Sequence, residues 1–356
     1  MQAIRVHPAP PSEPAYSPTN PAPPSALHLD TIAIPKPTEH GQLLVRIKAT
    51  TIIRDMLTWP ETYERAFPVL GHDFSGIVTE VFSGASNSSD SSSGDPGSSA
   101  LKPSDEVFGM AHADRGSTWA EYALVTANEV ALKPRGMGWE EAAALPLSAQ
   151  TAYEALFEHA GIPAPSIIST STKTRQDDAD GAAQQLQVLV TGAAGGVGIY
   201  LVQLAASAGV HVVAATSSNE RNESFLRGLG ADEVVEYGQL ENDVDRFDVI
   251  VDAVGGDVLT QCWKYVKGSG TLVTVDSASF DFVAEHRRRG ISREGVKALF
   301  FIVEGSGPVL RSLADLVDRG RLKSFVAESF PIARAKEAYE YANGRYSGRG
   351  KILLTL

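Results

Sequence analysis

Apolar residues in the middle of the chain recur with two alternating spacings. Val188–Val190 and Val210–Ala215 are short, uninterrupted apolar runs, and this pattern predicts strands buried on both faces. Between them, Val197–Ala208 places valine, leucine and alanine at helical spacing, and Gly209 marks the end of the predicted helix. The pattern therefore predicts a strand, a helix and a second strand within Gln187–Ser218.

The same alternation continues toward the C-terminus, whereas the first part of the chain is mostly strand-like. In the first part, strands are predicted at 43–49, 74–82, 106–108 and 119–125, and helices at 140–144 and 149–159. Later elements are a helix ending at 230, strands at 234–235, 249–254 and 271–275, helices at 308–319 and 333–343, and a strand at 351–356. This order indicates that a parallel-sheet domain is inserted between two halves of a β-rich domain.

Three segments break this pattern and are predicted to be surface loops. His7–Ser25 is rich in proline, Ser83–Ala100 is a low-complexity serine and glycine tract, and Pro163–Gln185 is rich in Ser, Thr, Asp and Gln. We assign these segments no chemical role.

Composition and charge narrow the function classes. The net charge of −12 argues against general attraction to nucleic acid or to an anionic membrane surface. No apolar run approaches the length of a membrane span, and the N-terminus lacks the apolar region of a secretion signal. Cys262 is the single cysteine, which excludes an intrachain disulfide and a cysteine-rich zinc site. We therefore expect a cytoplasmic enzyme.

The turn between the first predicted strand and its helix carries three glycines. Gly192, Gly195 and Gly198 follow the pattern GxxGxxG, with Ala194 where the common dinucleotide fingerprint has its middle glycine. Such a turn lets backbone N–H groups approach a pyrophosphate at the helix N-terminus. The turn predicts dinucleotide binding; a glycine-rich turn without a ligand is the alternative.

The end of the second strand distinguishes between cofactors. NAD-binding units place a carboxylate there for the ribose 2′-hydroxyl. Here the strand ends at Ser217 and Ser218, followed by Arg221, groups that suit a 2′-phosphate. The sequence thus favours NADPH. In the alternative reading, Ser217–Arg221 is only the cap and first turn of the next helix.

Several short motifs, in this order, resemble the medium-chain dehydrogenase/reductase superfamily, and within it the zinc-free quinone oxidoreductase and enoyl reductase branch. Besides the glycine turn they are Gly71–Val78, Trp119–Tyr122, Glu141–Leu147, Thr151–Tyr153, Leu229–Asp232, Asp252–Gly256 and Gly350–Lys351. The resemblance implies an α/β fold: a GroES-like β-rich catalytic domain at 1–147 and 299–356, and a Rossmann domain with a doubly wound parallel sheet at 148–298. It also implies an active site in the cleft between the two domains.

Zinc enzymes of this superfamily hold the catalytic metal with two cysteines and a histidine. This chain keeps His72, followed by Asp73, but has no cysteine near 50–55 or 146–151. Because even an open zinc site takes three protein ligands, we expect no metal. Hydride must then go to an acceptor that is already electrophilic, such as a quinone or an α,β-unsaturated carbonyl compound.

The resemblance suggests catalytic roles for two residues before the first motif. Tyr63 follows Asp55 by eight residues, as a tyrosine does in enoyl reductases and several quinone reductases of this branch. A phenol can donate a hydrogen bond and a proton, so Tyr63 is the candidate acid. Asp55 is expected to orient the loop or a cofactor hydroxyl, and Trp59 to line the pocket. Alternatively, Tyr63 is a pocket-wall residue and water supplies the proton.

The resemblance also implies cofactor contacts at positions that match family motifs. Beyond Ser217, Ser218 and Arg221, these are Thr151, Gly195, Gly196, Val197, Tyr237, Val254, Gly255, Phe301, Val303 and Lys351. The resulting hypothesis is an NADPH-dependent, zinc-free reductase of small quinones or enones. A trans-acting enoyl reductase of a biosynthetic pathway and a weakly catalytic NADPH-binding protein are the alternatives. A homodimer is possible, with Leu272–Val275 as a candidate sheet edge.

Overall fold

The computed structural model describes residues 1–82, 101–112, 114–165 and 185–356. The predicted loop Ser83–Ala100 lies outside the described residues, as does most of Pro163–Gln185. The predicted loop His7–Ser25 is described and is largely exposed, with a single short bridge between Ser17 and Asn20.

The described chain divides into two compact units. The β-rich unit comprises 1–147, 304–314 and 324–356, and the parallel-sheet unit comprises 148–303 and 315–323. The later boundaries differ from the expected return at 299. One reason is that β13 (Lys297–Phe300) pairs with β12 (Val266–Thr274) and so extends the parallel sheet. The other is that Lys323 exchanges backbone hydrogen bonds with the side-chain amide of Gln203, which ties 315–323 to the same unit.

The parallel-sheet unit contains a six-stranded sheet in the order β10-β9-β8-β11-β12-β13. Its strands, all parallel, are β10 (Glu233–Glu236), β9 (His211–Thr216), β8 (Gln187–Val190), β11 (Phe247–Asp252), β12 and β13. Crossovers run first to one side of β8 and then to the other, which makes the sheet doubly wound. The expected Rossmann architecture is confirmed.

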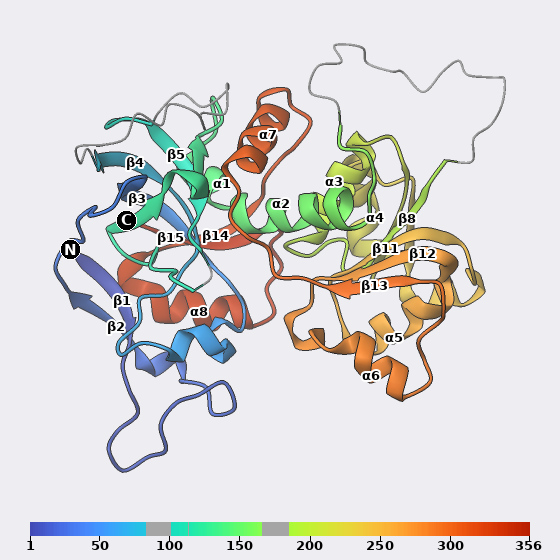
Figure 1. Cartoon of the computed structure of the whole chain (residues 1–356), viewed down its shortest axis with the longest axis horizontal. Helices are drawn as coiled ribbons and strands as arrows, with labels where there is room; N and C mark the ends of the chain where they lie inside the picture. Colours follow the sequence, from blue (N-terminus) through green and yellow to red (C-terminus); the bar gives the residue numbers. More distant parts are fainter. Residues whose placement is uncertain (83–100, 113, 166–184) are drawn as a thin grey trace. The chain divides into compact units, whose positions relative to one another are not determined.

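Helices cover both faces of this sheet (Figure 1). They are α3 (Gly198–Ser207), α4 (Asn219–Gly228), α5 (Gly256–Tyr265) and α6 (Phe282–Arg288), with α2 (Pro146–Tyr153) and a π-helical turn η5 (Glu154–His159) leading into the unit. The prediction that Leu272–Val275 is a sheet edge is wrong, because β13 pairs along β12 and is itself the edge strand.

The β-rich unit is built around a seven-stranded sheet in the order β14-β15-β3-β4-β5-β7 with β6 also paired to β3. These strands are β14 (Val326–Pro331), β15 (Lys351–Thr355), β3 (Gln42–Ile52), β4 (Asp73–Val81), β5 (Glu106–Met110), β7 (Val130–Leu132) and β6 (Tyr122–Thr126). β15 pairs with β3, so the C-terminal strand completes the sheet that the N-terminal part begins. Along the chain, the parallel-sheet unit therefore follows the first part of the β-rich unit and precedes its last strand.

Two further features complete the β-rich unit. β1 (Gln2–Val6) and β2 (Leu27–Thr31) form a separate antiparallel pair, and α8 (Ala335–Asn343) shares a buried core with them through Ala338 and Tyr339. The remaining helices are α1 (Trp139–Ala143) and α7 (Gly307–Asp318), whose last turn belongs to the parallel-sheet unit. Trp119 lies before β6 rather than in it, because its backbone N–H donates to Leu70 O at 2.9 Å and not to the β6 partner strand.

Candidate cofactor and acceptor sites

The glycine turn after β8 forms an open cradle of backbone donors. Gly192 has φ +60°, and a Cβ on Gly198 would lie 2.1 Å from Gly192 O, so the turn closes only with glycine at this position. Gly195 and Gly196 are exposed. In the described chain, the N–H groups of Gly196 and Val197 meet no backbone acceptor. Together with the N-terminus of α3, these donors fit the pyrophosphate of a dinucleotide.

Asp252, at the end of β11, ties together three strand ends beside this turn. Its carboxylate accepts hydrogen bonds from Thr191 Oγ1 at 2.6 Å, from Thr274 Oγ1 at 2.9 Å and from the Gly255 N–H at 2.9 Å. Burial raises the pKa of Asp252, and these donors oppose the rise. We did not assign Asp252 a role from sequence, although a carboxylate directly after a buried strand is a signal for such a position.

Most of the predicted cofactor residues follow the carboxyl ends of strands in this sheet. They follow β8 (Gly195, Gly196, Val197), β9 (Ser217, Ser218, Arg221), β10 (Tyr237), β11 (Val254, Gly255) and β13 (Phe301, Val303). Because the strands are parallel, all these positions lie along one edge of the sheet, next to the switch in strand order between β8 and β11. Ligands of doubly wound sheets bind at that edge.

Individual side chains along this edge are held by specific contacts. The Tyr237 hydroxyl accepts the Gly192 N–H at 3.0 Å, so it supports the turn directly, and burial raises its pKa. Val254 is 41% exposed. The Phe301 ring lies 4.3 Å from the His159 ring, centroid to centroid, and Thr151 is buried in α2.

A basic and an acidic side chain lie at the N-terminus of α4. Ser217 and Arg221 are exposed, and Ser218 occupies the cap position without bonding its own helix. Sequence reasoning missed Glu236, at the end of β10, whose Oε1 accepts the Asn219 N–H at 2.8 Å. No carboxylate ends β9 itself, but one reaches the first turn of α4 from the neighbouring strand.

Lys351 belongs to the β-rich unit, whereas the residues of the sheet edge belong to the parallel-sheet unit. Its Nζ lies 3.7 Å from Asp73 Oδ2, and Asp73 also accepts bonds from Thr51 Oγ1 at 2.7 Å and the Leu147 N–H at 2.6 Å. Burial lowers the pKa of Lys351, and the Asp73 carboxylate opposes that shift. The structure thus shows a buried ion pair for Lys351, while a contact with cofactor phosphate stays a prediction.

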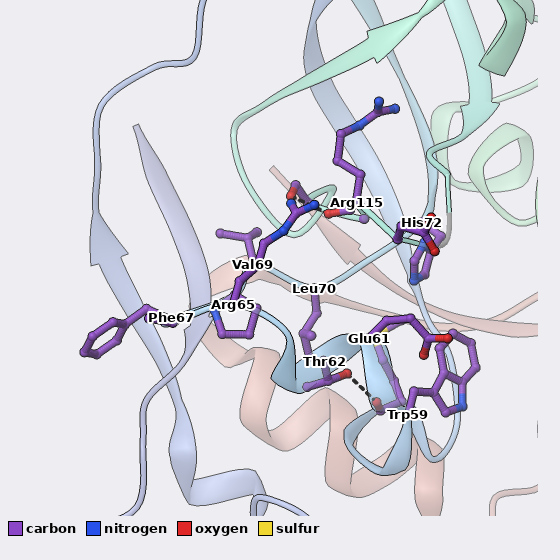
Figure 2. A pocket seen from close by; sticks show the side chains of 15 residues that line it. Trp59, Glu61, Thr62, Arg65, Phe67, Val69, Leu70, His72 and Arg115 are labelled. Carbon is purple, nitrogen blue, oxygen red and sulfur yellow. Dashed lines mark hydrogen bonds between the residues drawn. The ribbon is translucent and has the colours of Figure 1, made fainter. Parts of the chain in front are cut away.

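The β-rich unit contains a half-open pocket of about 160 Å³, which we call the His72 pocket. Figure 2 shows Trp59, Glu61 and His72 together on one side of it and Arg65 with Val69 on the other. His72 Nδ1 lies 3.2 Å from Ala111 O, and since a carbonyl only accepts, Nδ1 carries the ring proton. Burial lowers the pKa of His72, which favours the neutral ring. Trp59 lines this cavity, and a role for it in binding substrate stays a prediction.

The structure shows what holds the Tyr63 hydroxyl, while its role as the acid stays a prediction. Its hydroxyl donates to Leu57 O and accepts the Ala22 N–H at 2.8 Å, while the ring packs against the buried core. Because its only proton is held by a backbone carbonyl, Tyr63 joins two backbone segments and offers no free proton in this conformation. Asp55 has φ 56° and anchors the segment through its backbone N–H, which donates to Asn343 Oδ1 at 3.0 Å; its carboxylate is exposed.

The residues that could hold zinc do not fit that ion. Asp73 is committed to Thr51, Leu147 and Lys351, which leaves the unprotonated Nε2 of His72 as a single ligand atom. In the parts of the chain that the structure describes, no three His, Cys, Asp or Glu side chains come together as metal ligands would. Cys262, the one thiol, is buried in the parallel-sheet unit. Among the described helices, none combines the length and apolar character of a membrane span.

Comparisons with known proteins agree with this architecture. Residues 229–354 match the model of a family described as zinc-binding dehydrogenase. A probable zinc-binding oxidoreductase, mitochondrial, of Arthroderma benhamiae is 29% identical over 342 residues, covering 93% of this chain and 94% of the relative. A 2-methylene-furan-3-one reductase of Solanum lycopersicum is 32% identical over 293 residues, covering 79% and 62%. The solved quinone oxidoreductase from Coxiella burnetii has the same fold, with a TM-score of 0.75, 24% identity and coverage of 100% and 99%.

Proposed function

Because this chain belongs to the medium-chain dehydrogenase/reductase superfamily, in its quinone oxidoreductase-like branch, and is an oxidoreductase with a nicotinamide cofactor, we propose that it reduces quinones or α,β-unsaturated carbonyl compounds with NADPH and without zinc. The observation that carries the proposal is the convergence of the glycine turn, Ser217, Arg221 and Val254 on one edge of the parallel sheet.

The choice of NADPH rests on the first turn of α4. Ser217 and Arg221 are exposed there, and β9 ends without the carboxylate that would favour a ribose 2′-hydroxyl. The Glu236 carboxylate at the Asn219 N–H repels a 2′-phosphate, and the Arg221 guanidinium attracts it. We therefore expect a preference for NADPH whose size depends on these two side chains.

The proposed class of acceptor follows from the metal ligands and proton donors that the β-rich unit offers. The bound nicotinamide supplies a hydride, and without a metal the acceptor must itself delocalise the incoming charge onto oxygen. Quinones and enones do so, and the tomato relative is named as the reductase of such an activated alkene. Since Tyr63 is held by Leu57 O and His72 Nδ1 by Ala111 O, we propose that water entering the half-open His72 pocket delivers the proton.

A cofactor-oxidation assay tests the proposal. Purified protein is given NADPH or NADH with 1,4-naphthoquinone or 1-octen-3-one, and its metal content is measured by elemental analysis. We expect NADPH oxidation that depends on the acceptor, a higher kcat/KM for NADPH than for NADH, and no loss of rate with a chelator. Stoichiometric zinc, a preference for NADH, or no turnover across a broad acceptor panel would each refute it.

We also propose that two copies pair along β13. This strand pairs with β12 on one side only, and an edge strand presents unpaired N–H and C=O groups to another chain. Light scattering should then give twice the chain mass of 37.9 kDa. A monomer mass at assay concentration would rule out this dimer. A cytoplasmic location stays a prediction, to be checked by cell fractionation.

A further inference from the structure

A second pocket in the β-rich unit adjoins the His72 pocket. This half-open groove of about 220 Å³, which we call the Leu124 groove, shares Val69, Arg115 and Ser117 with the His72 pocket. The two cavities are therefore neighbours that share one wall.

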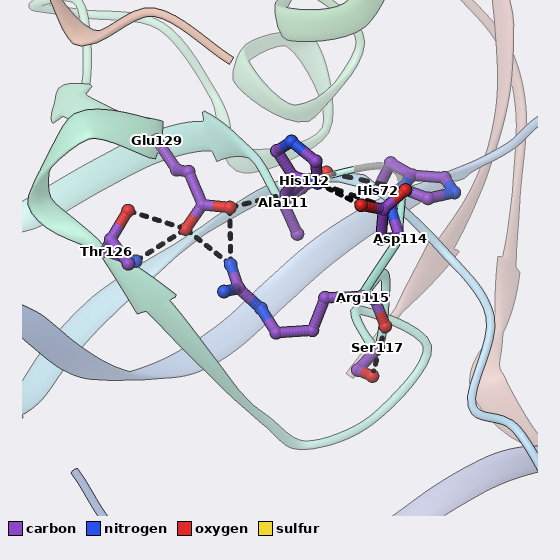
Figure 3. Close-up of polar contacts among 8 residues, drawn as sticks. All are labelled: His72, Ala111, His112, Asp114, Arg115, Ser117, Thr126 and Glu129. Atoms are coloured by element: carbon purple, nitrogen blue, oxygen red, sulfur yellow. Dashed lines mark hydrogen bonds and ion pairs between the residues drawn. The ribbon is translucent and has the colours of Figure 1, made fainter. Parts of the chain in front are cut away.

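The shared wall is held in place by a buried carboxylate. Figure 3 shows Glu129 in contact with Thr126, His112 and Arg115. Glu129 binds the Arg115 guanidinium and accepts the His112 N–H at 2.6 Å, and it accepts the Thr126 N–H, also at 2.6 Å. The wall can therefore keep its shape without a ligand.

The wall also contains backbone held in the left-handed region. Gly116 has φ +55° and Ser117 has φ +81°, and a Cβ on Gly116 would lie 3.1 Å from Gly71 O. Phe67, which lines the His72 pocket from the other side, has φ +52°. Non-glycine residues persist in this region only where the surrounding structure imposes it, and such positions cluster at ligand sites.

The chemistry of the two cavities differs. The His72 pocket has aromatic and polar residues, including Trp59, Glu61 and His72. The Leu124 groove is lined mainly by aliphatic residues, among them Ile32, Ala33, Pro35, Val69 and Leu124, and Arg115 is its one charged side chain. A ligand that spans both must have a polar or conjugated end and an aliphatic end.

We propose that the acceptor is amphipathic: its conjugated carbonyl end occupies the His72 pocket, and an unbranched aliphatic tail crosses the Val69–Ser117 wall into the Leu124 groove. This rests on the proposed function and names the substrate class within it. A chain of methylene groups suits the aliphatic lining of the groove.

A series of alkyl vinyl ketones of increasing length tests the tail. With NADPH saturating, KM for the ketone should fall about three- to fourfold for each of the first few added methylene groups and then level off once the groove is full. The kcat should stay within about twofold across the series, because the reacting end does not change.

Two variants distinguish binding of the tail in the Leu124 groove from nonspecific hydrophobic binding. Ala33 is exposed and follows β2, so Ala33→Trp fills the groove without disturbing a strand pair. Leu124→Gln makes the lining polar. Both should remove the dependence of KM on tail length and leave kcat/KM for the shortest ketone unchanged. Leu132→Gln is the matched control, since Leu132 is 53% exposed and lines neither cavity.

A binding measurement keeps this inference distinct from the reductase proposal. Saturated 2-alkanones lack the reactive alkene, so calorimetric titration with them reports binding even if no ketone is turned over. Tighter binding of 2-decanone than of 2-butanone in wild type and in Leu132→Gln, but not in Ala33→Trp or Leu124→Gln, supports the tail site. Equal slopes in wild type and Ala33→Trp would overturn it, as would turnover that ignores tail length. A change of oligomeric mass in Ala33→Trp would assign the groove to an interface between copies instead.

Discussion

Arg221 and Glu236 place opposite charges at the first turn of α4, and each has a different consequence for the cofactor. Arg221 is exposed after Ser217 and Ser218, and Glu236 accepts the Asn219 N–H. A guanidinium bound to a phosphate contributes more than a neutral hydrogen bond, and its removal leaves NADH almost unaffected. We therefore expect cofactor preference at this site to depend on these two side chains.

Replacement of Arg221 by alanine should weaken NADPH binding by roughly 1–3 kcal/mol, because the 2′-phosphate loses a charged donor. Affinity for NADH should change less than twofold. Fluorescence titration of both cofactors measures the two dissociation constants. The contact is refuted if the variant binds NADPH as tightly as the wild type does.

Tyr63→Phe distinguishes a structural hydroxyl from a catalytic one. The variant leaves the Ala22 N–H without its acceptor and Leu57 O without its donor, which should lower the free energy of unfolding by about 1–2 kcal/mol. We expect kcat to stay within twofold. Urea unfolding and steady-state kinetics on the same preparation give both numbers. A fall in kcat of about 100-fold with unchanged stability would restore Tyr63 as the proton donor.

At the scale of elements, the β8–α3 turn depends on close backbone approach. Gly198 begins α3, and a Cβ there would lie 2.1 Å from Gly192 O and 2.7 Å from Ala193 C. Backbone atoms cannot move aside as a flexible side chain can, so a larger residue must displace the turn. The donors of Gly196 and Val197 would be displaced with it.

We expect Gly198→Ala to reduce affinity for both NADPH and NADH at least tenfold, because the pyrophosphate cradle is common to the two cofactors. Gly228→Ala is the control, since no atom lies within 4 Å of its added Cβ and its φ is not in the left-handed region. In α4 that change should stabilise the helix by about 0.5–1 kcal/mol and leave cofactor affinity unchanged. Unaltered binding in Gly198→Ala would contradict the role of this turn.

At the scale of the whole molecule, each unit contains a buried histidine whose pKa is lowered by burial. His72 lies in the β-rich unit and His286 in the parallel-sheet unit. His286 Nδ1 accepts the Trp263 indole N–H at 2.7 Å, a bond that protonation of Nδ1 would break. In both cases the unfolded chain binds the proton more tightly than the folded chain does.

This difference fixes the sign of a pH effect. Because the pKa of each histidine is lower in the folded chain, the neutral ring stabilises the fold fully above the unfolded pKa of about 6.5. This stabilisation is lost as the pH falls below that value toward the folded pKa. The free energy of unfolding should therefore decrease from pH 7.5 to pH 5.5 in urea titrations. His286→Gln keeps an acceptor for Trp263 but cannot titrate, so its decrease should be smaller. An identical decrease in both proteins would exclude His286 as a contributor.

Elements with strong local signals were predictable from the sequence. The prediction of β8, α3 and the turn between them came from Val188–Val190, Val197–Ala208 and the glycines between these runs. It was possible because the spacing of apolar residues and the positions of glycines depend only on neighbouring residues. The helices α5 and α6 and the strand β13 were not predicted as such. In β13, the four residues Lys297–Phe300 become a strand because the β12 edge pairs with them, a contact absent from the local pattern.

For the site, the sequence by itself determined which chemical groups are present: a glycine cradle, hydroxyls and a guanidinium in place of a carboxylate after β9, and a histidine without cysteine partners. Only the tertiary structure decided how those groups are used. It turned the Tyr63 hydroxyl toward Leu57 and Ala22, joined Lys351 to Asp73, and brought Glu236 to α4. The physical reason is that a hydrogen bond depends on which backbone groups long-range pairing leaves within reach, and residue order does not specify that.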